Sequence, residues 1–250
     1  KMEVIMKKIF ITGITGLLGG NTAYNLKEKY DIYGVDRNKL IMPGVNYYNY
    51  DLTDYNKLEE NINEVNPEFI IHCAAAVNVD KCEEEPDYAF ELNTKLTEKI
   101  ADISRKKNIR MIYISTDAVY NGEKEGLYNE DDETDPVSVY GKSKLEGEKF
   151  VLESENNTVI RTNIYGFNIQ NKYSFGEWIL NSLMNNEKLN MFYDVFYSPI
   201  LVNDLTFFID SILDKNICGL YNVCSTGSVS KYEFGIMMKK IFNIKSGIIE

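Results

Sequence analysis

Residues 9–19 read IFITGITGLLG. The apolar run Ile9-Phe10-Ile11 suits a buried strand, and apolar side chains at helical spacing follow from Leu17 to Tyr30. Between these segments lie three glycines, at positions 13, 16 and 19. Without Cβ atoms, such a turn lets backbone N–H groups at a helix N-terminus approach a pyrophosphate, although a plain tight turn would also explain the glycines. The segment therefore predicts a strand, a candidate phosphate-binding turn and a helix.

The alternation of strand and helix continues along the chain. We expect further strands at residues 32–35, 45–52, 69–74, 111–114 and 159–160, and helices at residues 54–65, 87–107 and 139–155. Strands separated by helices need parallel crossovers. The pattern therefore predicts an α/β fold in which residues 1–166 form a Rossmann-type, doubly wound parallel sheet.

After Gly166 the pattern loosens, with helices expected at residues 174–184, 203–213 and 231–242 and a strand at residues 220–224. No linker rich in Pro, Gly or Ser divides the chain. We therefore expect residues 167–250 to form a smaller C-terminal lobe interleaved with the first domain, which helix 203–213 and strand 220–224 could rejoin. A further strand begins at Ile248 just before the last residue, so we expect the full protein to continue beyond Glu250.

The composition is that of a globular chain with enough apolar surface for a core, at 44% hydrophobic and 26% charged residues. The net charge of −11 repels a phosphate backbone, which argues against nucleic acid as a partner. No window approaches the ~20 apolar residues that span a bilayer, and the apolar core of a signal peptide is not found. We therefore expect a cytoplasmic location and no membrane contact.

The metal-binding and nucleophilic residue types are sparse. His72 is the single histidine, and the four cysteines form no C-x-x-C pair, which argues against a His/Cys zinc site and a Ser/His/Asp triad. His72 stands in an apolar run and is interpreted as a core residue with satisfied hydrogen bonds. The acidic run Glu83 to Glu85 is more simply a solvated helix start than a magnesium site, so no metal is predicted.

Two aspartates follow the next strands. Asp36 ends the expected strand 32–35, where a carboxylate can accept hydrogen bonds from both hydroxyls of an adenosine ribose, and Asp51 ends the following strand within reach of adenine. A surface turn would also explain Asp36, but the glycine turn beside it favours a dinucleotide site. Asp36 would repel a 2′-phosphate and Arg37 could pair with one, and we expect NAD(H) to bind at least as well as NADP(H).

A second group of residues joins the strand end Ser115-Thr116-Asp117 to the helix that carries Tyr140 and Lys144. Tyr140 and Lys144 are spaced i, i+4 and share one helical face. A free phenol has a pKa near ~10, and a nearby ammonium is expected to lower it, so that the pair can exchange a proton with a carbonyl or alcohol oxygen. Y-x-x-x-K alone is common on exposed helices. The inference depends on the order of glycine turn, aspartate, Ser-Thr and Tyr-x-x-x-Lys.

Four further segments are specific in combination: HCAAAVNVDKCEEEP (72–86), ISTD (114–117), YGKSKLEGE (140–148) and YSPI (197–200). Through them the sequence resembles the extended short-chain dehydrogenase/reductases, and within these the dTDP-4-dehydrorhamnose reductase-like family, over essentially all 250 residues. The resemblance implies a nicotinamide cofactor, NAD(H) or NADP(H), on residues 1–166. It also implies a nucleotide-sugar substrate bound mainly by residues 167–250, and it is compatible with a homodimer.

The resemblance also implies roles for particular residues. The catalytic residues would be Thr116, Tyr140 and Lys144. The cofactor would contact Gly13, Gly16, Leu17, Leu18, Gly19, Asp36, Arg37, Asp51, Leu52, Ala74, Ala75, Ala76, Asn93, Tyr140 and Lys144. The substrate would contact Val77, Asp117, Asn163 and Tyr197.

The reaction that the resemblance implies is reduction of a nucleotide-linked 4-keto-6-deoxysugar. Hydride would pass from the nicotinamide to C4 while Tyr140 protonates the developing alkoxide, Thr116 donates a hydrogen bond to the same oxygen, and Lys144 orients the nicotinamide ribose. Ala118 stands where related dehydratases place Glu, which argues against dehydration. Two alternatives stay open: a nucleotide-sugar epimerase, and a non-catalytic regulatory subunit of a methionine adenosyltransferase-like enzyme.

Aromatic side chains are concentrated beyond residue 166. Phe175 and Trp178 stand among apolar residues at helical spacing and are interpreted as core. The stretch Asp194 to Pro199 has no clear period, so we expect a loop over the cleft in which Phe196 and Tyr197 contact the nucleotide sugar.

Overall fold

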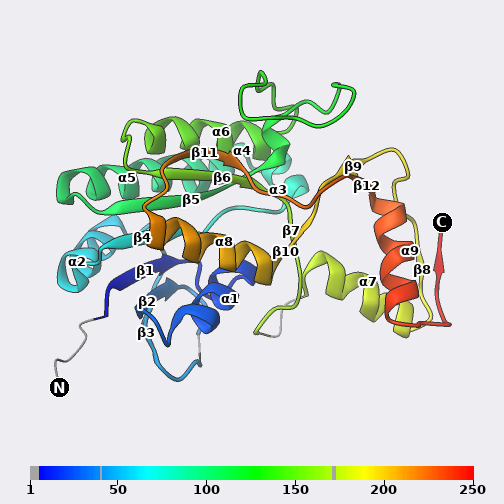
Figure 1. Cartoon of the computed structure of the whole chain (residues 1–250), viewed down its shortest axis with the longest axis horizontal. Coiled ribbons are helices and arrows are strands. Elements are labelled where there is room, and N and C mark those ends of the chain that lie inside the picture. Colours follow the sequence, from blue (N-terminus) through cyan, green and yellow to red (C-terminus); the bar gives the residue numbers. More distant parts are fainter. Residues whose placement is uncertain (1–5, 40, 171–172) are drawn as a thin grey trace.

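The computed structural model describes residues 6–39, 41–170 and 173–250. Within these residues, seven parallel strands form one sheet in the order β11-β6-β5-β4-β1-β2-β3 (Figure 1). The strands are β1 (Lys8–Thr12), β2 (Asp31–Asp36), β3 (Val45–Asn49), β4 (Phe69–His72), β5 (Arg110–Thr116), β6 (Thr158–Thr162) and β11 (Gly219–Asn222). The strand order reverses between β1 and β4, and a ligand crevice is expected outside the carboxyl ends of the strands at such a reversal.

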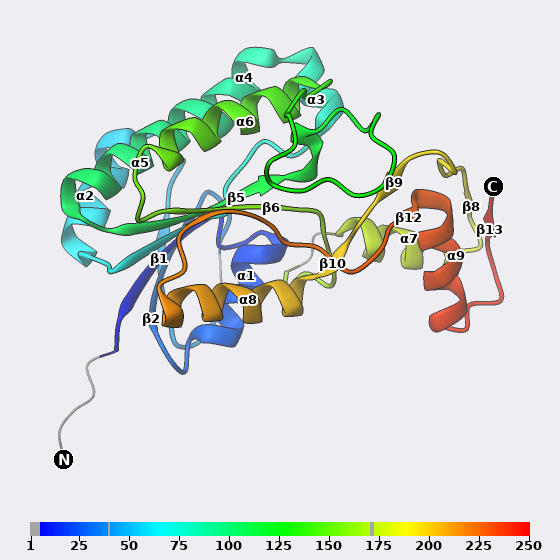
Figure 2. The ribbon, with the colours of Figure 1, turned by 45° about the horizontal axis from the view of Figure 1, so that its top comes forward.

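Helices cover both faces of the sheet because alternate residues of a strand point to opposite faces. Ile9 and Ile11 of β1 pack with α1 (Leu17–Leu26) and α8 (Val202–Lys215). Phe10 faces the other side, where α2 (Tyr55–Val65), α5 (Leu96–Lys107) and α6 (Val139–Leu152) lie. Figure 2 shows these two helical layers with the sheet between them. The predicted doubly wound parallel sheet is confirmed.

A small lobe lies beside the carboxyl ends of the strands (Figure 1). Its elements are α7 (Phe175–Met184), α9 (Lys231–Ile241), β8 (Lys188–Leu189) paired with β13 (Ile248–Ile249), and β9 (Phe196–Tyr197) paired with β12 (Val229–Ser230). Capping boxes begin both helices, at Ser174 and Ser230. The lobe has a hydrophobic core of its own, which includes Leu183 and Phe234.

The chain passes between the lobe and the sheet more than once. β7 (Ile164–Tyr165) and β10 (Ile200–Leu201) pair in parallel where the chain leaves the sheet and returns to it. After β10, α8 packs in the same core cluster as α1, and β11 adds to the sheet beside β6. Therefore α8 and β11, which follow the small lobe's helix α7 in the sequence, pack with the central sheet.

The structure corrects several expected boundaries. The strands expected to run to residues 52 and 74 end at Asn49 and His72. The helix expected at 87–107 is divided into α4 (Pro86–Phe90), a π-helical turn η1 (Glu91–Lys95) and α5. Another helix, α3 (Val79–Glu84), precedes it, so Glu83 and Glu84 end α3, while Glu85 is the N-cap at the start of α4.

His72 is fully buried, as predicted for a core residue. Its Nδ1 lies 2.6 Å from Thr12 Oγ1, and its Nε2 lies 3.0 Å from Thr97 Oγ1. Burial lowers the pKa of His72 to about 3, so the ring is neutral at neutral pH. In the described part of the chain, none of the helices has the length and apolar character to cross a membrane.

Candidate active site

A cleft of about 1110 Å³ lies where the strand order reverses between β1 and β4. It brings together most of the residues implied by the resemblance. Those that line it are Gly13, Gly16, Leu17, Leu18, Gly19, Asp36, Arg37, Asp51, Leu52, Ala74, Ala75, Val77, Thr116, Asp117, Tyr140, Lys144 and Asn163. Ala76, Asn93 and Tyr197 are not part of this lining.

Two glycines of the turn pack closely against neighbouring protein backbone. Gly13 has a φ of 68°, and a Cβ there would lie 2.7 Å from the backbone nitrogen of Ala74. A Cβ at Gly19 would lie 2.8 Å from the Cα of Ile14. Gly16 is the N-cap of α1 and, within the described residues, no side chain caps this helix. The first N–H groups of α1 are therefore available to a pyrophosphate, which fits the predicted phosphate site.

Asp36 lies at the end of β2, beside the glycine turn. Its Oδ2 accepts a hydrogen bond from the backbone N–H of Thr15 at 3.3 Å, and its Oδ1 accepts one from that of Asn38 at 3.0 Å. Asp51 lines the same end of the cleft, and hydrogen bonds from Thr53 lower its pKa. This end therefore has the carboxylates that an adenosine would need for its ribose and base.

Thr116 is the last residue of β5, and Tyr140 and Lys144 lie in the first half of the neighbouring α6. Ser138 caps α6 by accepting from the N–H of Gly141 at 3.1 Å, which fixes the first turn that carries Tyr140. Lys144 is 2% exposed, and its Nζ donates to the carbonyl oxygen of Ile114 at 2.7 Å. The tyrosine and the lysine therefore face the end of β5, where Thr116 stands.

The protonation states in this structure differ from the expectation for Tyr140. Burial raises the pKa of Tyr140 to about 12, although a hydrogen bond with Thr116 opposes the rise. Burial lowers the pKa of Lys144 to about 7, and the nearby Glu148 opposes that change. The expected lowering of the phenol pKa by Lys144 is therefore wrong for the protein without ligands, because desolvation dominates. At neutral pH Tyr140 holds its proton and can act as an acid.

The lowered pKa of Lys144 predicts a pH dependence of stability. Between about 7 and its ordinary value of 10.5, the unfolded chain binds this proton more strongly than the folded protein does. Stability from this group is therefore lost toward low pH and gained as pH rises. We expect the free energy of unfolding of the wild type, minus that of Lys144→Met, to increase between about pH 7 and about pH 9.

The control for this measurement is Lys142→Met, on the exposed face of the same helix. The difference in free energy of unfolding between the wild type and Lys142→Met should not change between about pH 7 and about pH 9. Denaturant unfolding without cofactor measures both differences. A difference in the free energy of unfolding between the wild type and Lys144→Met that is the same at every pH would contradict the lowered pKa of Lys144.

Asn93 joins the segment after β4 to α6 by hydrogen bonds. It is fully buried, and its Nδ2 donates to the carbonyl oxygen of Ala76 at 3.1 Å and to Ser143 Oγ at 3.0 Å. The backbone N–H of Ala76 donates back to Asn93 Oδ1 at 2.8 Å. The resemblance implies cofactor contacts for both residues, but the structure places Asn93 between the segment after β4 and α6. The π-helical turn η1 inserts a residue that lets this side chain turn inward.

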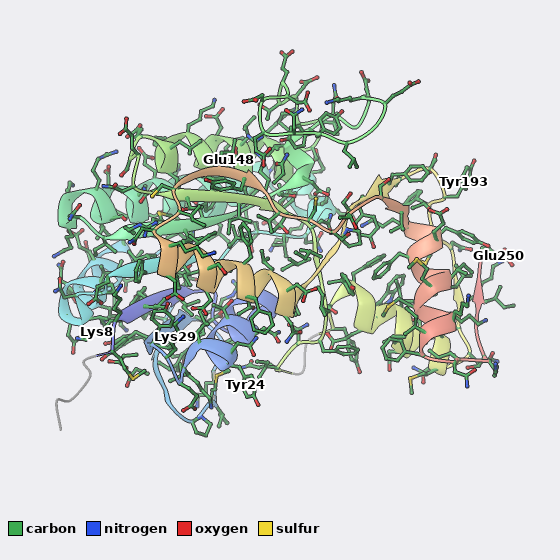
Figure 3. The ribbon with its side chains drawn as sticks, in the orientation of Figure 1. Lys8, Tyr24, Lys29, Glu148, Tyr193 and Glu250 are labelled. Atoms are coloured by element: carbon green, nitrogen blue, oxygen red, sulfur yellow. The ribbon has the colours of Figure 1, made fainter. Side chains whose placement is uncertain are left out.

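Glu148 and Arg161 form a buried ion pair near Lys144, with 1% and 5% exposure. Arg161 Nη2 lies 2.7 Å from Glu148 Oε2, and Arg161 Nε lies 3.0 Å from Oε1. Ser115 donates to Glu148 at 2.5 Å, and Arg161 donates to the hydroxyl of Tyr120 at 2.8 Å. Figure 3 labels Glu148 between α6 and the sheet. This pair was not predicted from the sequence, although Glu148 follows Lys144 by four residues on the same helical face.

The side of the cleft toward the small lobe contains Val77, Asp117 and Asn163. Asn163 Nδ2 donates to both oxygens of Asp117, at 3.2 and 3.1 Å. Burial raises the pKa of Asp117. Ser174 and Phe175, at the start of α7, also line this side and were not among the residues implied by the resemblance.

The stretch from Asp194 to Pro199 is not an irregular loop over the cleft, because β9 occupies part of it and pairs with β12. Tyr197 is 7% exposed and packs in the core of the small lobe, whereas Phe196 is exposed. The alternation of a strand turns one ring inward and the other outward. Trp178 is 40% exposed, so its interpretation as core is wrong, while Phe175 packs against the lobe core and also lines the cleft.

A family model described as the RmlD substrate binding domain matches residues 6–248. The chain belongs to this family. The match covers nearly the whole chain, including the glycine turn, Tyr140, Lys144 and the small lobe. It confirms the resemblance to the extended short-chain dehydrogenase/reductases that the sequence motifs indicate.

The similar proteins include some named as reductases and one named as a subunit of methionine adenosyltransferase 2. The dTDP-4-dehydrorhamnose reductase of Bacillus anthracis, crystallised in complex with NADP, is 31% identical, with 98% of this chain and 84% of that chain covered and a TM-score of 0.87. The probable low-salt glycan biosynthesis reductase of Haloferax volcanii is 28% identical, covering 96% of this chain and 82% of the relative. Methionine adenosyltransferase 2 subunit beta of Xenopus tropicalis is 30% identical, covering 96% of this chain and 73% of the relative.

Proposed function

We propose that this chain is an NAD(P)H-dependent reductase that converts a nucleotide-linked 4-keto-6-deoxysugar to the alcohol. One observation carries the proposal: Thr116, Tyr140 and Lys144 line the same cleft as the glycine turn and Asp36. A proton donor for a reacting oxygen thus shares one cavity with a site suited to a dinucleotide. Several similar proteins are named as dTDP-4-dehydrorhamnose reductases, which supports the proposal.

Residues of the cleft have separate roles in binding the cofactor and in proton transfer. The N–H groups at the start of α1 hold the pyrophosphate, and Asp36 accepts from the adenosine ribose. Lys144 donates to the nicotinamide ribose. When bound, the reduced nicotinamide supplies the hydride that reaches C4 of the sugar. Tyr140 donates its proton to the oxygen on C4, and Thr116 donates a hydrogen bond to the same oxygen.

The test is turnover with purified protein, dTDP-4-keto-6-deoxyhexose and NADH or NADPH. We expect one reduced cofactor to be oxidised for each sugar reduced. An epimerase would interconvert sugars without net consumption of cofactor, and a regulatory subunit would consume none. Cofactor binding with neither oxidation of the cofactor nor conversion of the sugar would overturn the proposal and favour the regulatory alternative, which has a relative in methionine adenosyltransferase 2 subunit beta.

We also propose that the cleft binds NAD(H) at least as well as NADP(H). The Asp36 carboxylate would stand close to a 2′-phosphate, and two like charges are costly in a partly dry cleft. Arg37 lines the same end and opposes this preference, and the Bacillus anthracis relative was crystallised with NADP. Calorimetric titration with NADH and NADPH measures the balance. NADPH binding more than about tenfold tighter than NADH would contradict the prediction.

The matched variant for this prediction is Asp36→Asn, which keeps the oxygen that accepts from Asn38 and removes the charge. We expect the ratio of NADPH to NADH affinity to rise by about tenfold in this variant, since only NADPH carries the additional phosphate. An unchanged ratio would show that Asp36 does not face the 2′ position. Homodimerisation and a cytoplasmic location stay predictions from the sequence.

A further inference from the structure

Tyr113 is a fully buried tyrosine of β5 whose ring lies against the side chain of Lys144. The ammonium nitrogen of Lys144 lies 4.0 Å from the centroid of this ring. The same nitrogen donates to the carbonyl oxygen of Ile114, the next residue of β5, at 2.7 Å. Two successive residues of β5 therefore contact the ammonium, one with an aromatic ring and one with a backbone oxygen, at the wall of the cleft that Lys144 lines.

The hydroxyl of Tyr113 fixes the far end of the ring. It lies 3.2 Å from the carbonyl oxygen of Asn93 in η1 and 3.4 Å from that of Lys144, and it can donate to either. Helix α6 passes this hydroxyl at Gly147, where a Cβ would lie only 2.7 Å from the oxygen. Gly147 follows Lys144 by three residues, so it lies on the same side of α6. The missing Cβ therefore lets α6 come close enough to β5 for the lysine to reach the ring.

The groups around Lys144 offer its charge little other compensation. Burial lowers the pKa of Lys144 to about 7, and Glu148 opposes this change. Glu148 is itself paired with Arg161 at 2.7 Å. The other titratable groups near the ammonium have pKa values that leave them neutral at neutral pH, namely His72, Cys73, Tyr113 and Tyr140. Because the face of an aromatic ring attracts a desolvated cation, the ring of Tyr113 stabilises the ammonium without carrying a charge.

We propose that Tyr113 is a positioning residue, whose ring holds the ammonium of Lys144 at the wall of the cleft and stabilises its charge there. The inference rests on the proposed function, in which this ammonium donates to the nicotinamide ribose. Tyr113 is not among the residues that line the cleft, so it acts on the reaction through Lys144. Without the ring, the amine should lose its proton at a lower pH and bind the cofactor less well at neutral pH.

The first experiment measures the pKa of Lys144 in the cofactor-free protein by NMR titration of the lysine side-chain methylene next to the nitrogen, with Lys144→Met to assign the signal. Tyr113→Leu removes the ring, and Tyr113→Phe keeps it. We expect the pKa of Lys144 to be lower than in the wild type by about 0.5 to 1.5 pH units in Tyr113→Leu and to agree within about 0.3 in Tyr113→Phe. The control is Phe10→Leu, which removes a fully buried ring from the same core cluster and should leave the pKa of Lys144 unchanged.

Fluorinated phenylalanines placed at position 113 give the same test with little change of shape. Fluorine withdraws electron density from the face of the ring, so trifluoro- and pentafluorophenylalanine should lower the pKa of Lys144 stepwise relative to Tyr113→Phe. This series decides the question if Tyr113→Leu fails to fold. A pKa of Lys144 that stays constant across the series, or that is unchanged or raised in a folded Tyr113→Leu, would overturn the proposal.

Turnover of dTDP-4-keto-6-deoxyhexose with NADH reports whether the contact matters for the reaction. At pH 7 we expect Tyr113→Leu to lower kcat/KM by about 2- to 15-fold, the loss that the lower pKa of Lys144 implies. The loss should be smaller at pH 6 than at pH 8, because acid restores the charge of the ammonium. A loss that is the same at every pH, as a purely structural defect would give, contradicts the positioning role. If the wild type does not reduce the sugar, the proposed function fails, whereas the NMR titration still tests the contact between Tyr113 and Lys144.

Discussion

Replacing Tyr140 by phenylalanine is expected to lower kcat by about 10²–10⁴. The change removes the hydroxyl and keeps the ring, so the dissociation constants of NADH and NADPH should change by no more than a few-fold. Burial raises the pKa of Tyr140 to about 12, so the phenol is protonated at neutral pH and supplies the proton that the reduced oxygen needs. Steady-state kinetics and cofactor titration on the same preparation measure the two effects.

The control is Tyr88→Phe. Tyr88 also lines the cleft, but it lies on α4, and its ring contacts Lys81, whose nitrogen is 4.2 Å from the centroid. Its hydroxyl has no place in the proton transfer, and we expect kcat to stay within about twofold of the wild type. A near-normal kcat in Tyr140→Phe would refute the catalytic assignment. A large loss in Tyr88→Phe would show that the hydroxyl of Tyr140 is not distinguished from others in the cleft.

Replacing Arg161 by methionine is expected to lower the free energy of unfolding by about 3–5 kcal/mol, because it leaves the buried carboxylate of Glu148 without its cation. The pair has 5% and 1% exposure, so water cannot replace the lost partner. Denaturant unfolding measures the change. A loss under about 1 kcal/mol would mean that the pair is solvated in solution.

Arg105→Met is the matched control. Arg105 forms ion pairs with Asp102 and Glu153 on the surface, where its side chain is 45% exposed. Exposed ion pairs contribute little to stability, so we expect the free energy of unfolding of Arg105→Met to fall by no more than about 1 kcal/mol. The double variant Glu148→Leu with Arg161→Met removes both charges, so its loss should be smaller than the sum of the two single losses. Strictly additive losses would contradict the account of an unpaired buried charge.

The central sheet and the ends of the cleft could be predicted from local patterns. Ile9 to Ile11 and the glycines that follow fix a strand, a turn and a helix within a few residues of one another. Because the carboxyl ends of parallel strands meet at one edge, Asp36 and Thr116 could be placed in one cleft without knowledge of the packing. The structure bears out both arguments.

The remaining features depend on contacts between distant segments. Asn93 turns inward because η1 adds a residue to a helical turn, and no periodic pattern signals such a turn. The direction of the Tyr140 pKa shift follows from burial, which i, i+4 spacing does not report. Tyr197 faces the lobe core because β9 pairs with β12, two segments about thirty residues apart in the sequence. Pairing of such short strands is decided by tertiary packing.

The most direct test of the reductase assignment follows the hydride itself. Purified protein is incubated with dTDP-4-keto-6-deoxyhexose and reduced cofactor that carries deuterium at the transferable position of the nicotinamide, and the sugar product is analysed by mass spectrometry and NMR. We expect deuterium on C4 of the product in the wild type, and almost none in Tyr140→Phe after the same time. A sugar converted without deuterium at C4, or a sugar left unchanged by protein that binds the cofactor, would contradict it.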